Sequence, residues 1–221
     1  EIVSSLALSP DGHLLALAAE SGEGTCHLWH LVRRKRLATF RGHEMMVRCV
    51  AFSPDGSTLA TASVDGNAKL WDAKTLKLKS AFKSPNSFLT ALAFSPDGKT
   101  LAVAGGQRRD KILASVMKLW DLSTGREMVS YKGHSDHTTC LAFSPDGKTL
   151  FSGGRDGAVK LWDAKSGKEQ ATLSVYREAV SALAVSPDGQ TLATGGETIA
   201  PITLWDVRSR KERWQTTKVL G

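Results

Sequence analysis

The polar side chains of a hydrolytic triad occur twice in this sequence, with the same spacing each time. They are His43, Thr61 and Asp65 in the first set and His134, Ser152 and Asp156 in the second. In both sets the hydroxyl residue follows the His by 18 positions, and the Asp follows the hydroxyl residue by 4. These are the groups that acyl transfer requires. However, the set recurs within one chain, and neither copy has a nearby loop that could form an oxyanion hole. We therefore predict no catalytic residues.

The sequence also offers few residues that could bind a metal ion or a cofactor. His134, Asp136 and His137 lie close together, but His134 already belongs to the repeated set, and the remaining pair is a weak ligand signal. Gly22 and Gly24 do not open a helix, so they are not expected to form a phosphate-binding loop. The three cysteines match no zinc-binding spacing. We predict neither a metal nor a cofactor.

An internal repeat reveals the elements that must position these side chains. The tetrapeptide Ser-Pro-Asp-Gly occurs five times at intervals of 44, 42, 49 and 42 residues, beginning at Ser9, Ser53, Ser95, Ser144 and Ser186. A Leu-Trp pair follows each copy, with its Trp at Trp29, Trp71, Trp120, Trp162 and Trp205. The next residue is Asp in four copies and His30 in the first. Two signals that keep one phase over five periods indicate a repeat architecture.

Each repeat carries signals for four short strands, which are clearest in the second repeat. Residues 47–53 alternate in polarity and end at the Pro-Asp-Gly turn, and residues 59–63 end at the Asp65-Gly66 hairpin. Residues 68–71 and 77–82 flank a turn at 72–76. No helical period of sufficient length occurs. The sequence therefore predicts an all-β fold of four-stranded antiparallel sheets.

The first strand of every repeat has one small face and one large face. The small face carries Ala7, Ala51, Ala93, Ala142 and Ala184 and, two residues earlier, Ser5, Cys49, Ala91, Cys140 and Ala182. The large face carries Leu8, Phe52, Phe94, Phe143 and Val185. Sheets that converge on an axis need a small side to pack at native density. Small residues at the same first-strand positions in all five repeats therefore favour sheets arranged radially around an axis. An ordinary β-sandwich would not explain why the small face recurs five times.

These phased motifs resemble the WD40-repeat family over essentially the whole chain. The family repeat begins with Gly-His, which occurs here at Gly42-His43 and Gly133-His134. The resemblance implies a β-propeller of four-stranded blades, in which a His, a Ser or Thr, an Asp and a Trp form a hydrogen-bonded tetrad. The matching residues are His43, Thr61, Asp65 and Trp71 in the second repeat and His134, Ser152, Asp156 and Trp162 in the fourth. In such a tetrad the Trp occupies the hydroxyl group, which argues further against a hydrolase.

The other three repeats depart from this pattern. The third has no Gly-His and has Val103 at the hydroxyl position, where the first has Leu17. The fifth keeps Thr194 and Trp205 but lacks the Gly-His and the hairpin Asp. We therefore expect two complete tetrads.

Length and composition are compatible with one or two domains that have a hydrophobic core, since the chain has 221 residues, of which 41% are hydrophobic and 23% charged. No apolar run approaches the roughly 20 residues of a membrane helix, and no secretory signal is visible. Three cysteines cannot all pair. We expect reduced thiols in an intracellular, cytoplasmic protein without membrane insertion. Because the chain begins at Glu1, we expect a processed, trimmed or partial product.

We expect one propeller domain over residues 1–221, with repeats at about 1–42, 43–84, 85–133, 134–175 and 176–221. Five repeats are fewer than the seven usual in the family that the chain resembles. An open arc of five whole blades would expose two apolar sheet faces. We therefore favour a part of a larger propeller or of a multidomain protein, with a closed five-bladed ring as the alternative.

The resemblance implies a non-enzymatic scaffold that binds partner proteins or peptides. It places the loops before the first strands and the hairpins after the second strands on one side, the hairpin face. The Ser-Pro-Asp-Gly turns and the turns after Leu-Trp lie on the opposite side, the turn face. Interface-type side chains occur in or beside hairpin-face loops at Met45, Met46, Phe88, His137, Arg155, Tyr176 and Arg177. Met46 and Phe88 could instead fill junctions between blades.

The third repeat is seven residues longer than the regular 42, and the excess lies between Gly106 and Lys118. Its hairpin should project, with Arg108, Arg109, Asp110 and Lys111 at the tip. We regard it as a candidate specificity element, with a neutral loop insertion as the alternative.

Two basic clusters fall on the turn face. They are Arg33-Arg34-Lys35-Arg36 in the first repeat and Arg208, Arg210, Lys211 and Arg213, beside Trp214, in the fifth. Together with the net charge of +7, they make a basic platform for nucleic acid or acidic partners an alternative function. The simpler interpretation is that they are solvated turns. A targeting or regulatory domain of a larger enzyme is a further alternative.

Overall fold

The computed structural model describes residues 2–19, 23–85, 87–109, 112–174, 177–197 and 202–216. They form twenty β-strands in five separate four-stranded antiparallel sheets. In every sheet, four strands that are consecutive in the chain also lie next to one another in space. The predicted all-β fold of four-stranded sheets is thereby confirmed.

We number the sheets blade 1 to blade 5 in chain order. Blade 1 contains β1 (Val3–Leu8), β2 (Leu14–Ala19), β3 (Thr25–His30) and β4 (Lys35–Arg41). Blade 2 contains β5 (Val47–Phe52), β6 (Thr58–Ser63), β7 (Asn67–Asp72) and β8 (Leu78–Lys83). Blade 3 contains β9 (Ser87–Phe94), β10 (Thr100–Arg109), β11 (Ile112–Asp121) and β12 (Glu127–Tyr131). Blade 4 contains β13 (Thr138–Phe143), β14 (Thr149–Gly154), β15 (Ala158–Asp163) and β16 (Glu169–Ser174). Blade 5 contains β17 (Val180–Val185), β18 (Thr191–Gly196), β19 (Thr203–Asp206) and β20 (Glu212–Gln215).

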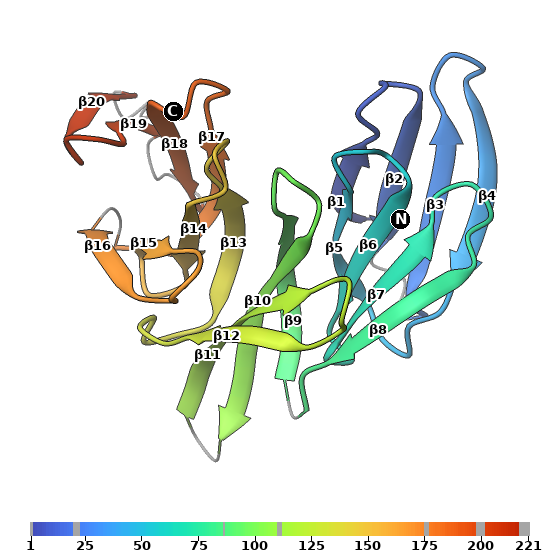
Figure 1. Ribbon diagram of the computed structural model, residues 1–221, viewed down its shortest axis with the longest axis horizontal. Coiled ribbons are helices and arrows are strands. Elements are labelled where there is room, and N and C mark those ends of the chain that lie inside the picture. Colours follow the sequence, from blue (N-terminus) through green and yellow to red (C-terminus); the bar gives the residue numbers. More distant parts are fainter. Residues whose placement is uncertain are drawn as a thin grey trace.

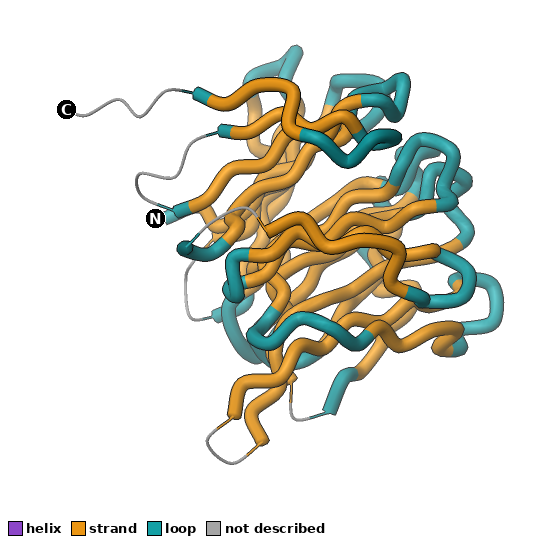
Figure 2. The backbone as a smooth tube through the Cα atoms, turned by 90° about the vertical axis from the view of Figure 1, so that its left-hand side faces the viewer, coloured by secondary structure: helices purple, strands orange, loops and turns teal. Residues whose placement is uncertain are grey.

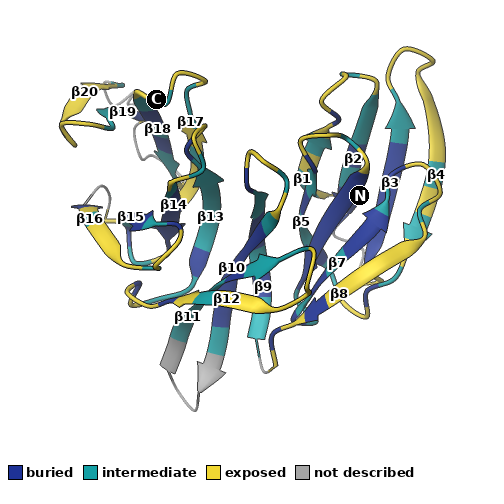
Figure 3. Ribbon diagram, viewed as in Figure 1, coloured by how far each residue is buried: buried dark blue, intermediate teal, exposed yellow. Residues whose placement is uncertain are grey.

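The blades follow one another around an arc (Figure 1). The first strands of successive blades contact one another and line the inside of this arc. Outer strands such as β4, β8 and β16 are largely exposed, whereas the second strands of the middle blades, β6, β10 and β14, are largely buried (Figure 3). The strands run between two sides that carry the loops, and the β10–β11 hairpin extends beyond its neighbours (Figure 2).

The core consists of four layers, one between each pair of neighbouring blades. Between blades 2 and 3, the small residues Cys49 and Ala51 of β5 face Phe94 of the next blade. On the other side of β5, Val50 and Phe52 pack against blade 1. The same alternation of small and large faces recurs at the other junctions. This alternation lets neighbouring blades pack closely around the inside of the arc, as the small and large faces of the first strands predicted.

The Ser-Pro-Asp-Gly motif builds the turn that joins the first and second strands. In blade 2, Ser53 Oγ donates to Asp55 Oδ1 over 2.5 Å and accepts the N–H of Thr58 over 3.0 Å. Gly56 has a φ of 70°, a conformation that disfavours residues with a Cβ. A Cβ at Gly56 would also lie 3.4 Å from Pro10 of the preceding turn. The motif therefore shapes each turn and stacks it against its neighbour.

The two ends of the arc expose faces that the inner blades bury. Leu6 on blade 1 is 66% exposed, whereas Val50, at the same position of blade 2, is 4% exposed. On blade 5, a Cβ built at Gly195 would meet no atom within 4 Å. At Gly153, the same position of blade 4, it would lie 2.7 Å from Val180 of blade 5. The described strands thus form an open arc, with blades 1 and 5 apart (Figure 1).

Candidate functional site

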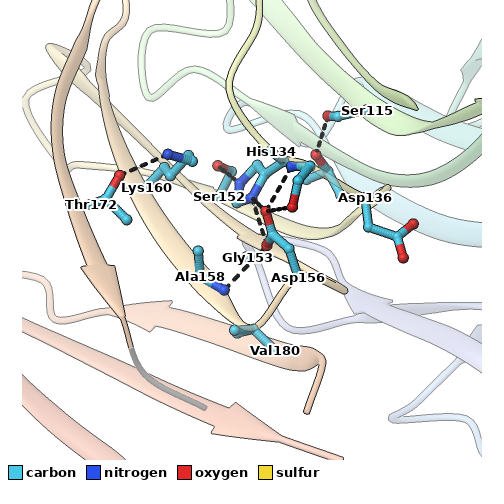
Figure 4. Close-up of polar contacts among 12 residues, drawn as sticks. Ser115, His134, Asp136, Ser152, Gly153, Asp156, Ala158, Lys160, Thr172 and Val180 are labelled. Atoms are coloured by element: carbon cyan, nitrogen blue, oxygen red, sulfur yellow. Dashed lines mark hydrogen bonds and ion pairs between the residues drawn. The ribbon is translucent and has the colours of Figure 1, made fainter. Parts of the chain in front are cut away.

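The fourth blade brings together the residues of the second triad-like set. Trp162 Nε1 donates to Ser152 Oγ over 2.8 Å, and His134 Nε2 lies 2.7 Å from the same oxygen. On its other side, His134 Nδ1 lies 3.0 Å from Asp156 Oδ1 (Figure 4). Asp156 also accepts the backbone N–H of Ser135 over 2.9 Å, which ties the loop before β13 to the β14–β15 hairpin.

The second blade repeats this arrangement atom for atom. Trp71 Nε1 donates to Thr61 Oγ1 over 2.9 Å, and His43 Nε2 lies 2.7 Å from that oxygen. His43 Nδ1 lies 2.9 Å from Asp65 Oδ2. Asp65 in turn accepts the backbone N–H of Asn67 over 2.9 Å within the β6–β7 hairpin. Both sets therefore link a buried Trp of the third strand to a hairpin on the hairpin face.

One assignment of protons satisfies every member of the chain in blade 4. The indole N–H of Trp162 donates to Ser152, and the hydroxyl of Ser152 donates to His134 Nε2. The protonated Nδ1 of His134 then donates to the carboxylate of Asp156. Linked hydrogen bonds of this kind hold the four side chains in one arrangement.

Electrostatics favour the ionised form of both carboxylates. Burial opposes ionisation of Asp156, but the hydrogen bonds from His134 and from two backbone N–H groups outweigh it and lower the pKa of Asp156 to about 2. The same balance, with His43 as the partner, holds the pKa of Asp65 well below its ordinary value.

The geometry of both sets is unsuited to a nucleophile. Thr61 and Ser152 are completely buried, and each hydroxyl oxygen accepts a Trp indole N–H. A substrate carbonyl would have to displace the Trp to approach within bonding distance of this oxygen. What the arrangement can do is fix loops of the hairpin face on the rigid sheets.

The remaining blades carry incomplete versions. In blade 5, Trp205 Nε1 donates to Thr194 Oγ1 over 3.0 Å. In blades 1 and 3, the buried Nε1 atoms of Trp29 and Trp120 have no hydrogen-bond partner within the described ranges.

A cavity of about 1180 Å³ opens at the hairpin face on the inside of the arc. Five of the predicted binding residues line it, from the loops and strands of blades 2, 3 and 4: Met45, Met46, Phe88, His137 and Arg155. Met45 is 47% exposed, and Arg155 is also exposed. Met46, Phe88 and His137 are half-buried, so they contribute to the blade junctions as well as to the cavity wall.

Phe88 and His137 form one wall of this cavity. Their rings meet edge to face, with centroids 5.4 Å apart. His137 Nδ1 lies 2.9 Å from Asp136 Oδ1, which orients the imidazole ring. A Cβ on Gly106 would lie 2.5 Å from Phe88 and 2.7 Å from His137, so this position must be glycine for the two rings to meet.

The other predicted residues lie elsewhere. Arg177 is exposed but does not line the cavity. Arg108 and Arg109 are the last residues of β10. Both β10 and β11 have ten residues, which makes this hairpin long, but the side chains of the two arginines lie outside the described part of the structure. Lys111 and Tyr176 lie outside the described residues altogether.

Sequence reasoning missed several residues of the cavity wall. Arg48 and Glu197 add a cation and an anion to it. Ser4, Thr90, Thr139 and Ser181 occupy the same strand position as Arg48 in the other blades and also line the cavity. The signal was available as a polar column across the five repeats, immediately before the small column.

The described residues contain no group of three or more His, Cys, Asp or Glu side chains placed to hold a metal ion. All three cysteines are free, and burial raises the pKa of Cys26 and Cys140 to about 12. Within the ranges that the structure covers, no helix has the length and apolarity that crossing a membrane requires.

The two basic clusters of the turn face lie at opposite ends of the arc, in blades 1 and 5. They differ in their contacts. Arg213 is paired with Asp206 and donates to Thr191 Oγ1 over 2.9 Å. All four residues of the first cluster, from Arg33 to Arg36, are exposed, and none of them has a described ion pair.

Comparison with protein families agrees with this architecture. The model of the WD domain, G-beta repeat, matches five segments: residues 1–30, 34–72, 76–113, 125–163 and 167–198. The chain belongs to the WD40 repeat family. The second segment runs from the start of β4 to the end of β7, so the WD40 repeat joins the outer strand of one blade to three strands of the next. WD40 domains are generally non-catalytic and typically serve as protein-interaction scaffolds. No curated protein matches the chain significantly.

Proposed function

We propose that this WD40 domain binds a partner protein or peptide in the cavity of its hairpin face. The observation that carries the proposal is the convergence of Met45, Phe88 and Arg155 on one cavity, although these residues come from three different blades. Aromatic, Met and Arg side chains are enriched where proteins bind one another. The tetrads of blades 2 and 4 hold the loops that present Met45 and Arg155, and Phe88 lies on strand β9, so the surface is preorganised.

The wall chemistry favours a partner segment that combines apolar and acidic side chains. Met45 and Phe88 supply apolar surface, while Arg155 supplies an exposed cation. Glu197 on the blade 5 side would repel a uniformly acidic segment. A carboxylate beside Arg155 and an apolar side chain against Phe88 fit this distribution of charge.

Affinity capture with the intact protein tests the proposal. We expect Phe88→Ala with Arg155→Ala to lose bound proteins that the wild type retains, and an added Arg177→Ala to have little further effect. Arg126→Ala, an exposed change on the turn face, serves as the matched control. An unchanged set of captured proteins with the cavity variant would contradict the proposal.

We further infer that blades of the same type cover both ends of the arc and complete a larger ring. At three internal junctions a first-strand hydroxyl reaches a carbonyl oxygen of the next blade: Ser4 to Val47 over 2.7 Å, Thr90 to Thr138 over 2.5 Å, and Thr139 to Val180. Ser181 occupies the same position in blade 5, and its described bond is to Gly195 of its own blade over 3.3 Å. The end of blade 5 thus presents the small residues and the hydroxyl group that the other blades use for docking.

Dye binding and native mass test this second proposal. With its ends uncovered, the 23.7 kDa chain should self-associate or bind a hydrophobic dye such as ANS. Leu6→Lys with Leu8→Lys should reduce both signals, because these side chains are 66% and 53% exposed on blade 1. A monodisperse monomer that binds no dye would contradict it.

A further inference from the structure

The turn between the third and fourth strands occurs five times, so four copies serve as an internal reference for the fifth. In blades 2 to 5 this turn begins with an Asp whose Oδ1 accepts a backbone N–H and a hydroxyl from a Ser or Thr three residues later, over 2.7–3.0 Å. The Asp residues are Asp72, Asp121, Asp163 and Asp206. Such side-chain bonds stabilise turns directly.

Blade 1 replaces both residues whose side chains make these bonds. His30 stands in place of the Asp, and its Nδ1 accepts the N–H of Arg33 over a long 3.4 Å. Arg33 stands in place of the Ser or Thr. Arg34 has a φ of 49°, a conformation that Leu76 in blade 2 and Arg210 in blade 5 share at the same position, where blades 3 and 4 have Gly125 and Gly167.

These replacements concentrate positive charge. With neutral His30, residues 30–36 carry a charge of +4, from four cations and no acid. The corresponding segments 72–78, 121–127, 163–169 and 206–212 range from −1 to +1. One turn of seven residues therefore holds more than half of the net charge of +7.

Exposed aliphatic side chains accompany the cations. Val32, within the turn, is 71% exposed, and Leu31 and Leu37 are 39% and 47% exposed. The residues at the position of Val32 in the other blades are all polar: Lys74, Ser123, Lys165 and Arg208. Blade 1 thus combines exposed aliphatic side chains with four cations, in a turn that lacks the Asp-centred hydrogen bonds of the other blades.

We propose that this turn, residues 30–37, docks the protein on the surface of an anionic lipid bilayer. Cations bind acidic headgroups, and an aliphatic tip between them gains energy by entering the interface. A nucleic acid fits less well, because phosphates offer Val32 nothing to contact and the one aromatic ring of the turn, that of His30, already stacks on His13 with ring centroids 6.2 Å apart. The turn and the β10–β11 hairpin lie at opposite edges of the molecule (Figure 1), so a docked protein keeps its hairpin face free for partners.

Vesicle cosedimentation with the full chain tests the proposal, using phosphatidylcholine with and without phosphatidylserine. We expect binding that requires phosphatidylserine. The key variant combines His30→Asp, Arg33→Ser and Arg34→Gly, which copies the turn of blade 4. Its apparent affinity should fall at least tenfold, because each cation near such a surface contributes about fivefold, or roughly 1 kcal/mol. Its melting temperature should not fall, since the variant restores the turn bonds, so lost binding cannot be ascribed to unfolding.

Two further variants make the outcome decisive. Arg208→Ala, Arg210→Gly and Lys211→Ala together change the net charge by the same three units in the equivalent turn of blade 5 and should leave binding within a few-fold of wild type. Val32→Lys adds a charge but removes the aliphatic tip, so vesicle binding should weaken. Equal losses from both turns, or equal binding to neutral vesicles, would overturn the proposal in favour of unspecific adsorption. Stronger binding by Val32→Lys, together with tighter binding to duplex DNA than to vesicles at the same salt, would overturn it in favour of a nucleic-acid site.

Discussion

Trp71 donates its indole N–H to Oγ1 of Thr61 over 2.9 Å inside blade 2. Blade 3 has the same strand register without the acceptor. Val103 occupies the position of Thr61, and the buried Nε1 of Trp120 has no partner in the part of the chain that the structure describes. An unpaired buried donor costs about 1–3 kcal/mol. The repeats therefore share a backbone architecture but not a complete hydrogen-bond network.

Val103→Thr should supply the missing acceptor in blade 3. Threonine is close to valine in shape, and its Oγ1 would meet the indole N–H of Trp120 as Thr61 meets Trp71. Its own proton has the carbonyl oxygen of Lys118 available, the register counterpart of the Lys69 oxygen near Thr61 in blade 2. We expect a gain of up to about 1 kcal/mol in the free energy of unfolding, measured by urea titration.

The reverse change in blade 2 is the control. Thr61→Val leaves both Trp71 Nε1 and His43 Nε2 without a partner, at a cost of about 1–3 kcal/mol for each group. If the two substitutions shifted stability in the same direction by similar amounts, hydrogen bonding to the Trp would not be the reason.

His43→Ala and His134→Ala should each lower the melting temperature, because both imidazoles are buried and each links a hydroxyl group to a carboxylate. A loss of about 1–3 kcal/mol is expected, which corresponds to several degrees for a chain of this size. His13→Ala should have little effect, since this side chain is 59% exposed beside Asp11. Differential scanning calorimetry of the three variants tests whether His43 and His134 stabilise the fold through the tetrads. Equal melting temperatures for all three variants would rule this out.

The fold was predictable because its determinants are local and repeated. Ser53, Asp55 and Gly56 specify a turn within four residues, and alternation specifies which face of β5 is small. The strand bounds predicted for blade 2 differ from the observed ones by one residue or so. Such signals do not depend on contacts far away in the chain.

The cavity was only partly predictable, because it depends on how blades are placed relative to one another. Met45, Phe88 and Arg155 were recognised by residue type and loop position, whereas Arg48 and Glu197 became visible only when the arc brought their blades together. The openness of the arc likewise follows from blade packing, which no single repeat encodes.

Stability should fall steeply in acid. The pKa of Asp156 is lowered to about 2 in the folded protein, below the ordinary value of 3.8 expected for the unfolded chain. Its ionised form therefore stabilises the fold fully above pH 3.8, and this contribution is lost as the pH falls from 3.8 toward 2. Asp65, whose pKa is also lowered, acts in the same sense.

Asp65→Asn with Asp156→Asn should lower the free energy of unfolding at neutral pH. The double variant should also lose less of its stability than the wild type as the pH falls from 3.8 toward 2. Urea titrations of wild type and variant across this pH range measure the two slopes. Surface aspartates such as Asp55, whose pKa is lowered to about 2 by hydrogen bonds from Ser53 and Ser57, should preserve the rest of the slope. Identical slopes in the two proteins would show that the tetrad carboxylates do not contribute.

A pair of glycines provides the most direct measure of which blade faces are covered. Gly153→Ala should cost about 1–3 kcal/mol, because the new Cβ would lie 2.6 Å from Cys140 Sγ and 2.7 Å from Val180 of the next blade. Gly195→Ala meets no atom within 4 Å, so in this chain it should be neutral or slightly stabilising. Chemical denaturation of both variants tests the contrast. If a further blade covers blade 5, as we propose, Gly195→Ala should become costly in the assembled ring, and a substitution that stays neutral in the complete assembly would show that nothing packs on this face.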